Sequence, residues 1–365
     1  MTPIEPRAAF IEACRADDLA GMKALLADAP GLALEARPLI EASARGAAEV
    51  VRLLLSEGAD PAAAAPRATP QRPLFQCLAP GGGEKHGGHV EVIRLLVAAG
   101  ADLEAEGAYQ SLTPLRLAAV VGSRALVERL LVLGARVDVF AAAMIADTDA
   151  LALMLDRDPA ACAARDAKGR QPLHALGMSR LWEASVEEEG RLLACARLLL
   201  AAGADLDAPT LKSDFCPSPL WWAISSGRCT TLALLFIALG ARLDGALAAA
   251  AWQGNVPIMA AILDRGAPVD GLSNKGCTAL HDCLLFGRSH AVPFLVDRGA
   301  DPNLTTPQGH TALHLAAATN QPAEIVRLLL AAGAAPEIED GEGRAPLDIA
   351  IERGHDEVAA ILQGA

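Results

Sequence analysis

Aromatic residues and positive charge are both scarce in this sequence. Phe, Trp and Tyr make up 3% of its 365 residues, which argues against a core built on large aromatic side chains. Acidic residues number 44 against 31 basic ones, giving a net charge of −13. Because a protein that binds nucleic acid needs a basic face to displace counterions from the phosphates, we expect no nucleic-acid partner.

Long apolar runs and paired cysteines are also missing. No uninterrupted apolar stretch reaches the roughly 18 residues of a membrane span, and the N-terminal MTPIEPRAAFIEACRADD lacks the apolar segment of a signal peptide. None of the eight cysteines belongs to a CxxC pair, and several lie in apolar stretches, where cysteine behaves as a small hydrophobe. We therefore expect reduced thiols, a cytoplasmic location and no membrane partner.

No familiar catalytic spacing occurs, neither GxSxG nor HExxH. The run GGGEK at 81–85 lacks the full spacing of a phosphate-binding loop, GxxxxGK followed by Ser or Thr. His86 and His89 are too few to hold zinc, which takes three or four protein ligands. We expect no cofactor and no metal, and no catalytic residue can be named, although groups from separate parts of the chain could still form an unusual active site.

What the sequence does contain is a unit that recurs every 33 or 34 residues, and its clearest copy is TALHLAAATNQPAEIVRLLLAAGAAP at 311–336. A Thr or Ser caps a first helix, and a Gly, or Asp17, Asp147 or Asn320 in its place, takes positive φ at the turn. An apolar stripe such as EIVRLLL then forms a second helix. A Gly-Ala pair ends the second helix in most units, at Gly58, Gly100, Gly134, Gly203, Gly240, Gly266, Gly299 and Gly333.

These residues resemble the ankyrin-repeat family, whose unit is close to G-x-TPLHxAAxxGHxEIVxLLLxxGADxN, over nearly the whole chain. The resemblance implies an all-α fold: one ankyrin-repeat domain over residues 1–365, a solenoid of about eleven helix pairs. It also implies β-hairpin fingers between pairs and a concave face made of fingers and first helices. At the His position of TPLH it implies a structural role for His174, His281 and His314, whereas Trp221 replaces that His in its own repeat.

The pattern changes at both ends of the chain and inside two of the pairs. Residues 1–33 and 338–365 are atypical and predict caps, because each would leave one side without a neighbour. Extra residues near 80–87 and 179–190 predict insertions between paired helices. The second insertion, SRLWEASVEEEG, carries Trp182 and three consecutive glutamates, and it is expected to be a surface excursion or, alternatively, a binding loop.

Two junctions between repeats are short. After Gly134 and Gly240 the chain enters the next helix almost directly, so we expect these junctions to lack a finger. The inner face should then be open at both places.

The resemblance implies that the two residues before the glycine between paired helices face the concave groove. Trp222 follows the His position and could reach the same surface. Trp221, Trp222, Phe215, Trp252 and Phe286 cluster in three successive repeats, where they form either a binding hot spot or core that fills the place of missing fingers. The predicted groove pairs are Val120 with Val121, Ser225 with Ser226, Trp252 with Gln253, and Leu285 with Phe286.

The favoured function is a protein-binding scaffold that presents the concave groove to a partner protein, with a monomer favoured. The alternative is an unusual enzyme or small-molecule binder with a pocket near the finger-less junction 240–255, where Asp214, Trp222, Trp252 and His310 are the groups of interest. The predicted partner-binding residues are Val120, Val121, Asp214, Phe215, Trp222, Trp252, Gln253, Leu285, Phe286 and His310.

Overall fold

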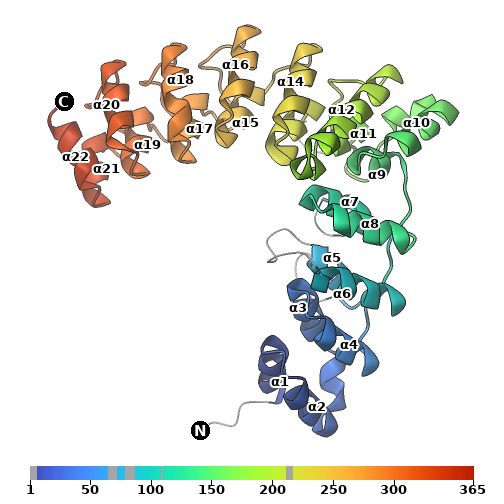
Figure 1. Cartoon of the computed structure of the whole chain (residues 1–365). Helices are drawn as coiled ribbons and strands as arrows, with labels where there is room; N and C mark the ends of the chain where they lie inside the picture. The colour runs from blue at the N-terminus through green and yellow to red at the C-terminus, as the bar shows by residue number, and fades with distance from the viewer. Residues whose placement is uncertain (1–5, 65–71, 79–86, 108–109, 211–216) are drawn as a thin grey trace, which may run out of the picture. The chain divides into compact units, whose positions relative to one another are not determined.

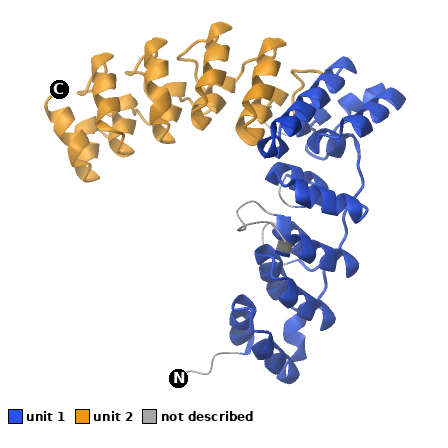
Figure 2. Ribbon diagram, in the orientation of Figure 1, with its two compact units in different colours: residues 1–204 blue, residues 205–365 orange. Residues whose placement is uncertain are grey.

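The computed structural model divides into two compact units, residues 1–204 and 205–365 (Figure 2). The described residues hold 22 α-helices and no β-strand (Figure 1). The all-α fold is therefore confirmed, the β-hairpin fingers are not, and the number of helix pairs stays a prediction. No helix in the described part of the chain is long and apolar enough to cross a membrane. The residues that the structure describes are 6–64, 72–78, 87–107, 110–210 and 217–365.

In the first unit the two helices of a pair pack against each other, and most also pack against the corresponding helix of the next repeat, as α3 does with α4 and α5. Three 3-10 helices, Pro30–Leu34, Pro159–Ala163 and Leu181–Ala184, lie between them. The α-helices are α1 (Pro6–Arg15), α2 (Leu19–Asp28), α3 (Ala36–Arg45), α4 (Ala48–Ser56), α5 (Pro73–Leu78), α6 (Gly87–Ala98), α7 (Pro114–Val121), α8 (Arg124–Val132), α9 (Val139–Met144), α10 (Thr148–Arg157), α11 (Pro172–Leu176) and α12 (Val186–Ala201).

The second unit follows the same plan, with α15 packed on α16 and α17. Two segments are not α-helical: a π-helical turn at Ala223–Gly227 and a 3-10 helix at Ser289–Ala291. The α-helices are α13 (Pro219–Trp222), α14 (Thr230–Ala238), α15 (Ala246–Gln253), α16 (Val256–Asp264), α17 (Ala279–Leu285), α18 (Val292–Asp297), α19 (Ala312–Ala318), α20 (Ala323–Ala331), α21 (Pro346–Glu352) and α22 (Asp356–Gln363).

The expected fingers are closed turns rather than strand pairs. In the turn Asp340–Arg344, the N–H of Asp340 donates to the carbonyl of Arg344 (2.9 Å), and the Asp340 carboxylate accepts the N–H groups of Glu342 and Arg344. Gly343 takes a φ of 76°, which a side chain would strain. One such closing bond is too few for a β-ladder. The same closing bond is present in Asp166–Arg170, Ser273–Cys277 and Thr306–His310.

The histidines of the TPLH position join each first helix to the following finger. His281 Nδ1 accepts the N–H of Thr278 (3.1 Å), and its Nε2 donates to the carbonyl of Leu304 (2.9 Å). His314 bonds in the same way to Thr311 and to the carbonyl of Arg344 (3.1 and 3.0 Å). Burial lowers the pKa of both imidazoles. Their expected structural role is therefore confirmed.

Two expectations about local structure are wrong in detail. The residue with positive φ between α9 and α10 is Ala146 (57°), not Asp147, because the Asp147 carboxylate is used as the N-cap of α10 and accepts the N–H of Ala150 (3.0 Å). A helix N-cap needs extended backbone, so the left-handed turn falls one residue earlier.

The segment 179–190 is not a pure surface excursion. Leu181 is fully buried in its 3-10 helix, and the N–H of Arg180 donates to the carbonyl of Ala119 (3.0 Å). The three glutamates lie in the first turn of α12, where negative charge is favourable at a helix N-terminus. Whether this segment and 80–87 are insertions, and whether the chain ends are caps, stay predictions.

Candidate binding cavity

A hollow in the second unit lies among aromatic side chains from three successive repeats. It has a volume of about 450 Å³ and is lined by Trp221 of α13, Trp252 of α15 and Phe286 at the end of α17, with Asp282 also in its wall. The rings of Trp252 and Phe286 meet with centroids 5.8 Å apart. Both remain exposed, by 37% and 41%. Two neighbouring aromatic rings thus stand at the mouth of an open cavity.

The cavity exists because the finger before α15 is missing. Residues 265–278 separate α16 from α17 and include a closed turn, whereas only residues 239–245 separate α14 from α15. The wall on that side consists of small residues, Gly245, Ala248 and Ala249. The missing finger and the small wall residues leave open a volume that a finger occupies in neighbouring repeats.

The replacement of His by Trp221 follows from the same gap. In the repeats of α17 and α19 the His donates to a carbonyl of the next finger. At α13 the next junction provides no finger for such a bond, and Trp221 instead lines the cavity and packs edge-on against Trp222, with centroids 5.3 Å apart. The aromatic side chain thus contributes apolar surface where a buried imidazole would lack its partner.

The first helix of this repeat also holds an extra residue. The interval between the N-caps Ser218 and Cys229 is one residue longer than that between Thr113 and Ser123. The π-helical turn Ala223–Gly227 accommodates it, and Arg228 rather than a glycine takes positive φ (53°). Single π-turns of this kind often mark functional positions in helices.

Asp282 is the main electrostatic feature of the cavity. Its residue is 8% exposed, and its carboxylate forms no hydrogen bond or ion pair with any residue that the structure describes. Burial raises the pKa of this carboxyl to about 6, although the nearby Lys275 ammonium opposes the shift. At neutral pH the cavity therefore contains a mostly ionised carboxylate that is poorly solvated and unpaired.

An adjoining hollow extends this surface. It has a volume of about 340 Å³ and shares Gly245, Ala248 and Ser273 with the cavity. Leu272 in its wall is exposed. Together the two hollows make a groove that runs from the aromatic side chains over α15 to the junction that follows α16.

The predicted site residues divide into several groups. Trp252 and Phe286 are brought together at the cavity, and Leu285 lies exposed beside them. Gln253 is half-buried and donates from its side-chain amide to the carbonyl of Ser225 (3.2 Å). Trp222 packs on Trp221 without lining the cavity.

Other predicted residues lie elsewhere. Val120 in the first unit is buried, at 6% exposure, and Val121 is half-buried. His310 lies in a finger turn next to Asp340 (Nε2 to Oδ2, 3.5 Å), away from the cavity lining. Asp214 and Phe215, like His86, lie outside the described residues.

Sequence reasoning missed Asp282 and Lys275 as cavity residues. Asp282 directly follows His281, which is the same repeat position that Trp222 occupies after Trp221. That position was identified as groove-facing only for Trp222. Applying it to every repeat finds Asp282 from the sequence, whereas its lack of a partner is visible only in the structure.

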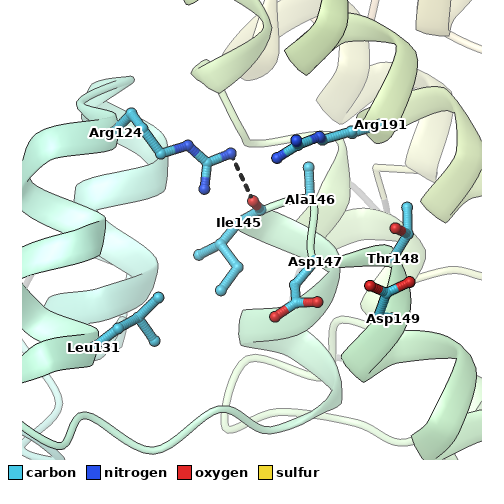
Figure 3. Close-up of a pocket in the computed structure, with 8 residues that line it drawn as sticks. All are labelled: Arg124, Leu131, Ile145, Ala146, Asp147, Thr148, Asp149 and Arg191. Atoms are coloured by element: carbon cyan, nitrogen blue, oxygen red, sulfur yellow. Dashed lines mark hydrogen bonds between the residues drawn. The ribbon is translucent and has the colours of Figure 1, made fainter.

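A hollow in the first unit contrasts with this cavity. It has a volume of about 330 Å³, and Figure 3 shows Arg124 of α8 and Arg191 of α12 reaching toward it. Arg124 donates to the carbonyl of Ile145 (3.1 Å) and forms an ion pair with Glu188, and Arg191 pairs with Glu187 (2.6 Å). Its two guanidinium groups are therefore already neutralised, and little remains for a ligand.

His89 and the cysteines also have structural surroundings. His89 is buried, and its Nε2 lies 3.2 Å from the carbonyl of Ala44. Burial raises the pKa of Cys195 and of Cys283 to about 12, so neither is a reactive thiolate. Within the described ranges no three His, Cys, Asp or Glu side chains come together as a metal site would require.

Comparison with known proteins gives a consistent result. Family models described as ankyrin repeats match residues 37–65, 220–306 and 291–365. Human cyclin-dependent kinase 4 inhibitor B is 34% identical over 122 residues, which are 33% of this chain and 88% of that protein. Two much longer proteins match over a small part of their own length. E3 ubiquitin-protein ligase Ufd4 of Drosophila melanogaster is 42% identical over 28% of this chain and 4% of the ligase, and human Rabankyrin-5 is 32% identical over 40% of this chain and 14% of that protein.

Proposed function

We propose that this chain, which belongs to the ankyrin-repeat family, is a scaffold that binds another protein through the aromatic cavity of its second unit. The observation that carries the proposal is the exposed pair Trp252 and Phe286 at the mouth of that cavity. Large aromatic side chains that remain accessible beside a cavity are typical of interface anchors. Their position on packed helices means that little ordering cost opposes binding.

Three further features support this surface. The groove continues into the adjoining hollow with the exposed Leu272, so an extended segment of a partner has room beside the anchors. Leu285 adds exposed apolar area at the same helix end as Phe286. The charged groups of the other large hollow, in the first unit, already pair within the protein.

Partner capture with matched variants tests the proposal. The tagged full-length chain is used to retain proteins from an extract of its source organism, and the affinity of each retained protein is then measured after purification. We expect the affinity of the double variant Trp252→Ala, Phe286→Ala for the partner to fall by at least about 100-fold, since truncated anchors cost roughly 2 kcal/mol or more of binding free energy each. Leu239→Ala removes a similarly exposed apolar side chain away from the cavity and is the control. Unchanged binding by the folded double variant would place the interface elsewhere.

A second candidate is small-molecule binding in the same cavity. Its volume of about 450 Å³ is within the range of known ligand sites, roughly 300–1,000 Å³. In that case the low-molecular-weight fraction of the extract would raise the melting temperature of the chain but not that of the double variant. A thermal-shift measurement with the low-molecular-weight fraction and with the protein fraction of the extract separates the two functions.

A further inference from the structure

The cavity joins aromatic faces to an unpaired carboxylate, and from this we propose that the partner's anchor is an arginine side chain. The inference rests on the proposed function, because it concerns the group that enters the same cavity. Trp221, Trp252 and Phe286 supply the aromatic walls, and Asp282 supplies the charge. The occupant is therefore the guanidinium of a basic segment in a partner protein.

The electrostatics of the cavity favour a cation. An apolar anchor would cover Asp282 and remove its remaining water, leaving a buried carboxylate without any partner. An acidic anchor would add repulsion at short range. A cation gains both from the carboxylate and from the negative faces of the aromatic rings, among which Trp is the strongest.

The shape of the cavity favours arginine over lysine. A guanidinium is flat, so it can lie against an indole ring and still donate two parallel hydrogen bonds to one carboxylate. It is also more weakly hydrated than an ammonium, so entering a cavity with aromatic walls costs it less.

Lys275 is the positive group in the wall that opposes this arrangement. It lies on the finger turn Ser273–Cys277, is exposed, and forms no ion pair with the residues that the structure describes. Its flexible stem can carry the ammonium into solvent when a guanidinium enters. Lys275→Ala should therefore strengthen binding of the basic segment rather than weaken it.

The overall charge of the chain suits the same partner. The net charge of −13 attracts basic segments and repels acidic ones at long range. This field adds to the rate of encounter, while the cavity selects the side chain. The two effects act at different distances and favour the same sign of partner.

Selection from random peptides tests the chemistry while the natural partner is still unidentified. A phage-displayed dodecapeptide library is selected on the full-length chain, on Asp282→Asn and on Asp297→Asn, which neutralises an exposed carboxylate outside the cavity. We expect arginine to be enriched at one peptide position with the wild type and Asp297→Asn, and this enrichment to disappear with Asp282→Asn. Enrichment of apolar or acidic residues at the anchor, or arginine enrichment that survives Asp282→Asn, would overturn the proposal.

Affinities of the best peptide then test whether its arginine contacts Asp282. Versions with arginine, lysine and neutral citrulline at the enriched position are titrated by tryptophan fluorescence. Citrulline should weaken binding to the wild type by at least about tenfold, and Asp282→Asn should weaken the arginine peptide equally while leaving the citrulline peptide unchanged. A lysine peptide that binds as tightly as the arginine one would contradict the choice of guanidinium.

The outcomes separate this inference from the proposed function. If a partner or peptide no longer binds Trp252→Ala, Phe286→Ala but still binds Asp282→Asn, the proposed binding surface is supported and the arginine anchor is contradicted. If no peptide in the library prefers the wild type over the aromatic double variant, the proposed binding surface itself is contradicted.

Discussion

The two short junctions of the chain, one in each unit, differ in what lies where the finger is missing. After α8, the side chain of Arg116 forms an ion pair with Asp138, and its guanidinium lies 4.8 Å from the ring centroid of Phe140. After α14, Trp221 occupies the same repeat position but lines an open cavity. Both junctions lack a finger, and at the second one a cavity lies where the finger would be.

The residue that begins the next helix accounts for the difference. Asp138 caps α9 by accepting the N–H of Ala141 (2.8 Å), and its second oxygen reaches Arg116. Gly245 precedes α15 with a φ of 68° and has no side chain to offer. A missing finger is therefore closed only when the repeat before it and the repeat after it supply complementary groups.

Removing Arg116 should produce the largest effect on stability. Arg116→Ala deletes the ion pair and the contact with Phe140, and leaves Asp138 partly buried without its cation. We expect the free energy of unfolding to fall by about 3 kcal/mol, measured by urea denaturation. Arg242→Ala, which removes an exposed pair with Asp244, should change it by less than about 0.5 kcal/mol. Equal losses for both variants would show that the junction is not held by Arg116.

Replacing a histidine tests what a finger adds to a normal junction. His281→Ala leaves the N–H of Thr278 and the carbonyl of Leu304 without their partner, at a cost of about 2 kcal/mol. Burial lowers the pKa of His281, so its contribution is present above the ordinary histidine pKa of about 6.5 and is lost as the pH falls below it. The gap between wild type and variant should therefore shrink on acidification. His310→Ala, in the turn, is the control.

Neutralising Asp282 should stabilise the open junction. Burial raises the folded-state pKa of this carboxyl to about 6 from an ordinary 3.8, so wild-type stability declines as the pH rises between these values. Asp282→Asn avoids this penalty, and we expect a gain of roughly 2 kcal/mol at pH 7 that vanishes near pH 4. A carboxylate that merely supported the first turn of α17 would give a loss instead. Thermal unfolding at both pH values decides between the two.

Truncating the cavity aromatics should have the smallest effect on stability. Trp252 and Phe286 keep more than a third of their surface exposed, so each change to Ala should lower the free energy of unfolding by about 1 kcal/mol or less. If the two rings instead filled the core, losses of roughly 3–5 kcal/mol would follow. Chemical denaturation of the same variants used for binding gives the comparison directly.

The repeat plan could be predicted well because its signals are local. The caps at Thr278 and Thr311, the Nδ1 contacts of the histidines three residues later and the apolar second helices each depend on neighbours within one unit. The short junctions at 134 and 240 were visible as changes in spacing, and the structure has no finger turn at either. Trp252 and Phe286 were found from their place before the inter-helix turn.

The errors arose where a residue's environment depends on another repeat or on competing local roles. Leu181 looked like part of an acidic loop, but the backbone contact of Arg180 with Ala119 places it in the core. Val120 matched the groove template, yet packing buries it. Asp147 was assigned the left-handed turn, while its carboxylate serves better as a cap.

The sequence by itself determined the helical repeat, the Nδ1 contacts of the histidines with their helix caps, and the place of Trp252 and Phe286 before the inter-helix turn, because these depend on residues close along the chain. Tertiary structure decided which short junction closed and which stayed open. That outcome depends on whether Arg116 meets Asp138, or Trp221 faces Gly245, across neighbouring repeats. It also decided that Asp282 is buried without a partner, since desolvation and pairing are properties of the assembled packing rather than of any one segment.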